Sequence, residues 1–241
     1  MPPDPTTPVV ETSNLSRRFG ARWAFARVSL TVSPGERVLL LGANGSGKTT
    51  LLRVLSTVLG ANEGNLRLFG RDPRREPEVV RARLALLSHA VGFYEDLSAL
   101  DNLRVFGELL GLRAHRGAPL GREALCETLL QVGLEPLRGD PIRAFSAGMR
   151  KRLQIAAVLL KRPDLVLLDE PFAALDPSGM DQMAALIREL PGAVIIASHQ
   201  VERASALCDR GLLLDKGLPR WVGPARDAWA AWRAVHETSP S

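Results

Sequence analysis

Apolar residues in this chain occur in short runs, and longer stretches of helical or alternating periodicity separate them. Four of the runs are continuous enough for strands buried on both faces: Val38–Leu41, Leu165–Leu168, Ala193–Ala197 and Leu212–Leu214. Residues 50–55 and the stretches between the later runs have the apolar spacing of helices that pack on a sheet. The pattern therefore predicts an α/β core in which crossover helices join parallel strands.

Two segments depart from this pattern. Apolar and polar residues alternate between Val9 and Val32, which predicts antiparallel strands beside the core. Between Tyr94 and Leu160 we find no strand pattern and expect an inserted helical subdomain, with helices at Ala99–Leu110, Arg122–Val132 and Ala147–Leu160.

Size and composition fit one large domain with an inserted subdomain. The chain has 241 residues, of which 46% are hydrophobic and 24% charged, as in ordinary soluble domains. We expect residues 1–8 to be a disordered lead-in and residues 9–223 to form the main domain. The helical subdomain is expected at about 92–160, and residues 224–241 are expected to form a C-terminal tail.

Charge and cysteine content exclude several classes of partner. The net charge of +5 comes from scattered arginines, so we expect no nucleic acid partner. Cys126 and Cys208 lack metal-ligand spacing and are expected to be buried, reduced thiols. No stretch approaches the roughly 18 apolar residues that span a bilayer, and the N-terminus does not resemble a signal peptide. The chain itself is therefore not expected to cross a membrane.

The sequence GANGSGKT at residues 42–49 lies between a predicted strand and a predicted helix, which is the context of a phosphate-binding loop. Its glycines let successive N–H groups and the helix N-terminus face an anion. Lys48 would reach the β- and γ-phosphates of a nucleotide, and Thr49 would bind Mg²⁺. The alternative is a glycine-rich turn without a ligand. The residues expected to contact the nucleotide are Gly42, Asn44, Gly45, Ser46, Gly47, Lys48, Thr49 and Thr50.

A pair of acidic residues follows another buried strand. Asp169 stands where a carboxylate would complete the Mg²⁺ site of a phosphate-loop protein. The adjacent Glu170 would polarise the water that attacks the γ-phosphorus. The alternative is that the pair caps the next helix.

The remaining landmarks carry a family resemblance. Phe145–Met149 opens a long helix, Ala174–Asp176 follows the acidic pair, and Ser198–His199 follows the next buried strand. In this order the motifs resemble the ATP-binding subunit of ABC transporters, from about Val9 to Gly223. The resemblance implies a P-loop NTPase (RecA-like) α/β fold with a parallel-sheet core, an antiparallel β-subdomain and an inserted helical subdomain.

The resemblance also implies roles for individual residues. Phe19 corresponds to an aromatic residue that stacks on adenine, although it could instead be a core residue. Ser146 and Gly148 correspond to the signature loop, which binds the γ-phosphate of the nucleotide held by the other protomer. Asp176 corresponds to a residue that crosses between the two sites. His199 corresponds to the histidine that orients the attacking water, so Glu170, His199 and Lys48 form the expected catalytic set.

The chain departs from the family pattern in three places. Phe145, Ala147 and Met149 replace the usual residues of the signature loop, whose serine and second glycine are retained. His89 stands where the family has a glutamine that binds Mg²⁺, and we expect a water-mediated contact there. We expect no C-terminal regulatory domain of the kind found in many importer ATPases.

The implied function is ATP hydrolysis, with ATP and Mg²⁺ as cofactors and closure of a homodimer as the power stroke. Integral membrane permease subunits are the expected partners, and the inner face of the cell membrane is the expected location. The stretch from Leu87 through Leu103, with His89 at the glutamine position, resembles the ATPase subunit of the heme exporter of cytochrome c maturation. The alternatives are an ATPase of another exporter (drug, lipid or polysaccharide) and a soluble ATPase of iron–sulfur cluster assembly.

Overall fold

The computed structural model describes residues 7–88, 92–112, 120–136 and 139–237. The described residues form two compact units. One, the α/β unit, contains the chain up to Ser88, Asp164–Pro171 and the chain from Pro191 onwards. The other, the helical unit, contains the chain between these segments, including Phe172–Leu190. The helical unit therefore includes a segment that lies outside the range of about 92–160 expected for a helical subdomain.

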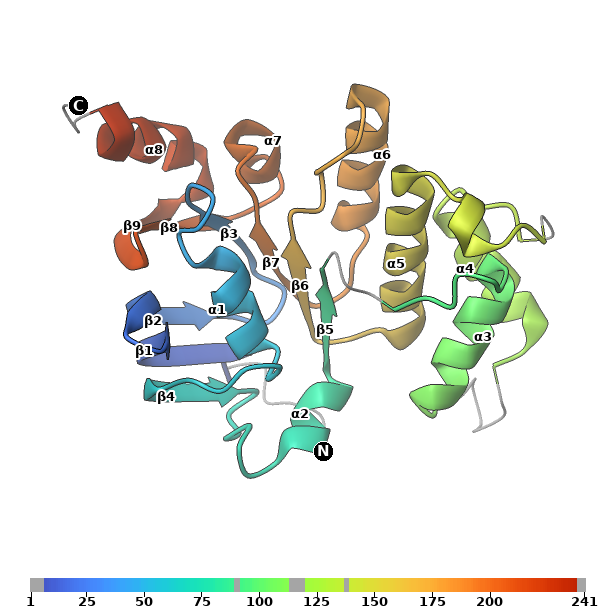
Figure 1. Cartoon of the computed structure of the whole chain (residues 1–241), viewed down its shortest axis with the longest axis horizontal. Helices are drawn as coiled ribbons and strands as arrows, with labels where there is room; N and C mark the ends of the chain where they lie inside the picture. Colours follow the sequence, from blue (N-terminus) through green and yellow to red (C-terminus); the bar gives the residue numbers. More distant parts are fainter. Residues whose placement is uncertain (1–6, 89–91, 113–119, 137–138, 238–241) are drawn as a thin grey trace. The chain divides into compact units, whose positions relative to one another are not determined.

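A six-stranded sheet forms the centre of the α/β unit (Figure 1), in the order β5-β6-β7-β3-β8-β9. All neighbouring strands are parallel except β8 and β9, which form an antiparallel hairpin. Every residue of β6 and β7 is buried, as expected for central parallel strands. The strands are β3 (Arg37–Leu41), β5 (Leu84–Leu87), β6 (Leu165–Asp169), β7 (Ala193–Ala197), β8 (Arg210–Asp215) and β9 (Leu218–Pro224).

A second sheet in the same unit is antiparallel and has the order β2-β1-β4. It consists of β1 (Val10–Phe19), β2 (Arg22–Val32) and β4 (Glu63–Leu68). β1 and β2 confirm the antiparallel strands predicted between Val9 and Val32. Helix α1 (Lys48–Leu55) contacts strands of both sheets, and its buried leucines belong to the core that the sheets share. This packing fixes the start of α1 against the ends of both sheets.

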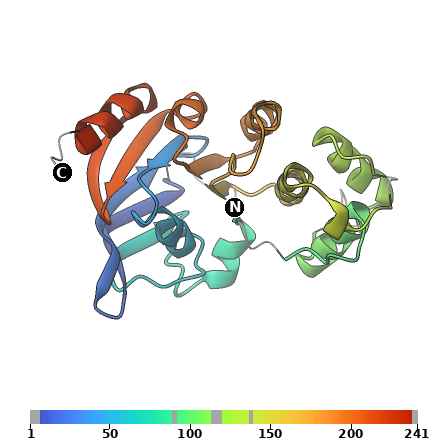
Figure 2. The same ribbon diagram turned by 45° about the horizontal axis from the view of Figure 1, so that its top comes forward.

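Three short helices complete the α/β unit: α2 (Pro77–Ala82), α7 (Val201–Ser205) and α8 (Ala228–Glu237). Helix α8, red in Figures 1 and 2, lies along the orange strands β8 and β9. The expected tail of residues 224–241 thus contains the end of a strand and a helix, while residues 1–6 of the expected lead-in lie outside the described residues. No helix in the described parts of the chain is long and apolar enough to cross a membrane.

The helical unit contains α3 (Ala99–Leu109), α4 (Arg122–Gln131), α5 (Ala147–Lys161) and α6 (Pro177–Arg188). The first three confirm the expected helices to within one residue at each end. Three of the four have a side-chain N-cap: Ser98, Ser146 and Asp176 each accept a hydrogen bond from the third residue of the following helix. The capping residues of α5 and α6 are therefore fixed in position by the start of their helices.

The cysteines are less buried than their apolar neighbours in sequence indicated. Cys126 and Cys208 are both free thiols of intermediate exposure. Burial nevertheless raises the pKa of the Cys208 thiol to about 12, so it stays protonated at neutral pH.

Replacing a buried residue of β6 tests how tightly this central strand is packed. Leu167 of β6 is fully buried, so Leu167→Ala should lower the free energy of unfolding by about 2–5 kcal/mol, through lost burial and a cavity. Val58 is 65% exposed, and Val58→Ala should change the free energy of unfolding by less than about 0.5 kcal/mol. Urea unfolding curves measure both. Equal effects of the two substitutions would contradict this packing.

Candidate nucleotide site

The phosphate-binding loop joins β3 to α1 and depends on glycine at two positions. Gly47 is the N-cap of α1 and has a φ of 103°, and a Cβ there would lie 2.3 Å from the carbonyl oxygen of Ala24. A Cβ on Gly42 would lie 2.2 Å from Ser46 Oγ. The loop is thus folded too closely on itself and on β2 for side chains at these positions.

Two side chains inside the loop are suited to an anion. Lys48 Nζ donates to the carbonyl oxygens of Gly42 (2.6 Å) and Ala43 (3.1 Å), and it lies 4.0 Å from Glu170 Oε1. Burial lowers the pKa of the Lys48 ammonium, and the Glu170 and Asp169 carboxylates oppose that shift. Ser46 Oγ is buried and has no hydrogen-bond partner. A phosphate in the loop would give this hydroxyl an acceptor.

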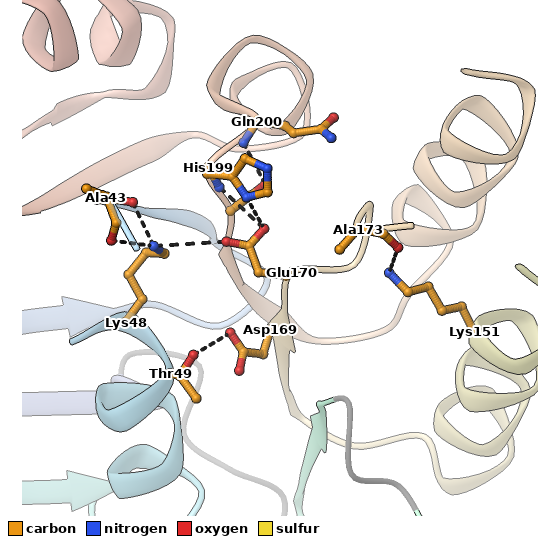
Figure 3. Close-up of polar contacts among 11 residues, drawn as sticks. Ala43, Lys48, Thr49, Lys151, Asp169, Glu170, Ala173, His199 and Gln200 are labelled. Carbon is orange, nitrogen blue, oxygen red and sulfur yellow. Dashed lines mark hydrogen bonds and ion pairs between the residues drawn. The ribbon is translucent and has the colours of Figure 1, made fainter. Parts of the chain in front are cut away.

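The end of β6 supplies the acidic residues. Asp169 is its last residue, and its Oδ1 accepts a hydrogen bond of 3.1 Å from Thr49 Oγ1 (Figure 3). A hydroxyl and a carboxylate are the hard oxygen ligands that Mg²⁺ prefers. No group of three acidic, histidine or cysteine residues that could hold a metal exists among the described residues. A magnesium ion here would therefore take further ligands from phosphate and water.

Glu170 and His199 meet where the neighbouring strands β6 and β7 end. The two strands are parallel with Asp169 opposite Ala197, and the Glu170 N–H extends the ladder by donating to Ala197 O at 2.9 Å. Glu170 Oε2 lies 2.9 Å from His199 Nδ1 and accepts a bond of 3.4 Å from the His199 backbone N–H. Figure 3 shows the Glu170 carboxylate between Lys48 and His199. This arrangement joins a cation, a carboxylate and an imidazole at the mouth of the loop.

A pocket of about 460 Å³ lies beside the loop, and its volume suits a nucleotide-sized ligand. Phe19 lines it and is 52% exposed, so it is not a core residue. Sequence reasoning missed Arg22, Trp23 and Ala24, which line the same pocket. The available signal was the hairpin turn at residues 20–21, which sets Arg22 opposite Phe19 in the β1–β2 pairing. The full lining is Phe19, Arg22, Trp23, Ala24, Asn44, Gly45, Gly47, Lys48, Thr49, Thr50 and Glu170.

The other predicted residues form a second group in the helical unit. Ser146 and Gly148 at the start of α5 and Asp176 at the start of α6 line one pocket of about 370 Å³. Lys151 of α5 donates a hydrogen bond of 2.5 Å to Ala173 O, in the segment that leads to Asp176 (Figure 3). The signature serine and the Asp176 loop are therefore held together within this unit. His89 lies outside the described residues.

The comparison with protein families identifies this arrangement. The profile of the family described as ABC transporter matches residues 25–173, which is more than half of the chain. The chain belongs to the ABC transporter family. Its fold and motifs are those of the family's ATP-binding, ATP-hydrolysing subunit, and the predicted P-loop NTPase fold is confirmed.

Individual ABC proteins resemble the chain over most of its length. The daunorubicin resistance ATP-binding protein DrrA3 of Streptomyces coeruleorubidus is 36% identical over 211 residues, covering 86% of this chain and 66% of DrrA3. The thiamine import ATP-binding protein ThiQ of Jannaschia sp. (strain CCS1) is 38% identical over 208 residues, covering 83% of this chain and 87% of ThiQ. The solved structure of an ATP-binding subunit of an ABC transporter matches with a TM-score of 0.79 and 25% identity, covering 97% and 95% of the two chains. This ABC ATPase spans about two thirds of the length of DrrA3.

A substitution at Gly47 tests the loop of this ABC ATPase. Gly47→Ala places a Cβ against Ala24 O. The loop also holds this position at a positive φ, which is strained for alanine. We expect ATP affinity to fall at least about tenfold, since 1.4 kcal/mol of strain has that effect. Equilibrium dialysis with ATP measures it. A Cβ added at Gly121 would meet no other atom within 4 Å, and its φ of −69° suits alanine. Gly121→Ala should therefore retain wild-type affinity for ATP. Unchanged affinity in Gly47→Ala would refute the assigned loop geometry.

Proposed function

We propose that this chain is the ATPase subunit of an ABC exporter, and that two copies enclose two ATP molecules between them. The proposal of ATP hydrolysis rests on one observation, the arrangement of Lys48, Glu170 and His199 beside the hydrogen-bonded pair Thr49 and Asp169. These five side chains provide a cation, a base, an orienting imidazole and two oxygen ligands for a metal ion. All five belong to the α/β unit.

In the proposed mechanism Glu170 is the general base. Its carboxylate lies next to the phosphate-binding loop, so it can accept a proton from a water molecule that attacks the γ-phosphorus. His199 fixes one carboxylate oxygen through Nδ1, and its imidazole ring orients that water, while Lys48 balances negative charge on the β- and γ-phosphates. Thr49 and Asp169 are the residues that would hold Mg²⁺, which would neutralise phosphate charge when bound.

The base of ATP is proposed to stack on Phe19, because this ring lines the pocket and is half-exposed. The amides and side chains of residues 42–50 are proposed to hold the phosphates. His89 stays a prediction as a water-mediated contact to Mg²⁺.

The second copy is inferred from the role that the family resemblance gives the signature residues, which belong to the helical unit. In the resemblance to ABC ATPases, Ser146 and Gly148 bind the γ-phosphate held by the partner copy, and Asp176 crosses between the two sites. The Ser146 hydroxyl and the N-terminal end of α5 suit a phosphate oxygen. Closure around ATP and opening after hydrolysis would then drive the permease.

Export is the proposed direction of transport. Relatives are named for resistance to daunorubicin and linearmycin and for bacitracin transport, although one is named for thiamine import. None of these names concerns heme, so the heme exporter suggested by Leu87–His89 gains no support from them. We propose a small-molecule exporter of the drug-resistance kind, with the ATPase bound to permease subunits at the inner face of the cell membrane. No observation favours the iron–sulfur cluster alternative.

Replacing the proposed base tests the mechanism. Glu170→Gln keeps the size and polarity of the side chain but removes the proton acceptor, so turnover should fall by about 10²- to 10⁴-fold. ATP binding should persist, and the variant should accumulate as an ATP-bound dimer. Phosphate release and sedimentation velocity with and without ATP measure the two effects.

The control for this experiment is Glu189→Gln, which changes an acidic residue at the C-cap of α6, away from the proposed site. It should keep wild-type turnover and form no trapped dimer. Wild-type turnover in Glu170→Gln would rule out Glu170 as the base. A Glu170→Gln variant that loses turnover but stays monomeric with ATP would contradict the two-copy arrangement.

The surface around Phe93, Tyr94 and Phe106 is the proposed docking site for the permease. Tyr94 is 55% exposed, and its backbone is held on both sides by buried Asn102, which accepts from Tyr94 N and donates to Tyr94 O. We expect Tyr94→Asp to reduce co-purification with the permease at least about tenfold, because a carboxylate would be buried unpaired. Leu130→Asp changes an equally exposed apolar residue of α4 and should have no effect. Full co-purification of Tyr94→Asp would refute this docking surface.

A further inference from the structure

Phe19 has a cation stacked on it. The guanidinium carbon of Arg17 lies 4.8 Å from the centre of the Phe19 ring, within the range of a cation–π contact. The two residues are two positions apart in β1, so their side chains emerge on the same face of the strand. Phe19 lines the nucleotide pocket and Arg17 does not. Arg17 therefore contacts the ring without lining the pocket itself.

The guanidinium of Arg17 is also fixed in place. Its Nη1 donates to Gly60 O at 3.0 Å, in the segment that follows α1. Its Nε is buried and has no hydrogen-bond partner, and none of its described contacts is to a carboxylate. Among the described residues the Arg17 guanidinium has no ion pair and no hydrogen bond besides that to Gly60 O, and the Phe19 ring lies against it.

We propose that Arg17 is a positioning residue of the nucleotide site that acts through Phe19. This inference rests on the proposed stacking of adenine on Phe19. By covering one face of the ring and tying it to Gly60, Arg17 holds the other face toward the pocket before the nucleotide arrives. The positive charge also draws electron density from the ring, which favours stacking with an electron-rich purine.

The inference separates two parts of nucleotide affinity. A residue that acts through the ring strengthens binding of the base and leaves binding of the phosphates unchanged. A residue that contacts the phosphates, or that only maintains the fold of the hairpin, would affect both parts. Inorganic tripolyphosphate has the phosphates of ATP without the base, so it distinguishes these roles.

The test compares ATP and tripolyphosphate binding by calorimetry. Arg17→Gln removes the charge and keeps a donor for Gly60 O. We expect it to weaken ATP binding about three- to tenfold, the range of a partly desolvated cation–π contact, and to change tripolyphosphate binding less than about twofold. Arg17→Lys restores a cation and should recover ATP affinity to within about twofold of wild type.

Arg83 supplies a matched control. Its guanidinium carbon lies 4.0 Å from the ring centre of Phe69, and neither residue lines the nucleotide pocket, so Arg83→Gln removes a similar cation–π contact that does not involve Phe19. ATP affinity in this variant should stay within about twofold of wild type. In a Phe19→Leu background, Arg17→Gln should have no further effect on ATP affinity, because the ring through which it acts is gone.

Two outcomes would overturn the inference while leaving the stacking role of Phe19 intact. One is unchanged ATP affinity in Arg17→Gln when Phe19→Leu weakens ATP binding. The other is an equal loss of ATP and tripolyphosphate affinity in Arg17→Gln. If Phe19→Leu itself leaves ATP affinity unchanged, both the stacking proposal and this inference fail. If the wild-type chain binds tripolyphosphate and ATP equally well, the base adds nothing to affinity, and both the stacking proposal and the inference about Arg17 fail.

Discussion

The parallel pairing of β3, β6 and β7 is the constraint on which the rest of the site depends. It brings the carboxyl ends of three strands to one edge of the sheet, where the phosphate-binding loop, Asp169–Glu170 and Ser198–His199 follow directly. The pairing extends one residue past β6, through the hydrogen bond from Glu170 N to Ala197 O. Glu170 there adopts a φ of 52°, a conformation that a non-glycine residue adopts at a cost. This strained residue is the proposed base.

The electrostatics of the site hold the Lys48 ammonium beside the loop. Lys48 is buried at a cost that lowers the pKa of its ammonium, and two carboxylates and two carbonyl oxygens offset that cost. These groups hold the amine beside the loop before any phosphate is bound. A phosphate that enters the loop can replace the carbonyl contacts with stronger charge-assisted ones. The side chains therefore need little rearrangement when they bind a nucleotide.

The sequence predicted the features that depend on local pattern. A loop with fixed glycine positions and long buried runs can be recognised without tertiary information, and so the core strands and the three helices were found. Strand β5 was missed, although its run of four apolar residues is as long as the predicted strand Val38–Leu41. β4 was missed because all but its last residue are at least partly exposed. Phe172–Leu190 belongs to the helical unit through tertiary contacts, which periodicity does not reveal.

The surroundings of Phe19 could be predicted only in part. The turn at residues 20–21 could have placed Arg22 opposite Phe19. The pairing of β1 with β2 changes register between Arg17 and Arg18, and such an irregularity cannot be predicted from alternation. The ABC motifs, by contrast, gave Lys48, Asp169 and Glu170 directly. The motifs identify these residues, and the pairing of β3, β6 and β7 brings them close together.

The most direct test of the account is a crystal structure of the Glu170→Gln variant with ATP and Mg²⁺. The account predicts two copies related by a twofold axis, with each γ-phosphate within hydrogen-bond distance of Lys48 in one copy and of Ser146 in the other. A structure in which ATP occupies the loop but Ser146 of neither copy approaches a phosphate would contradict it.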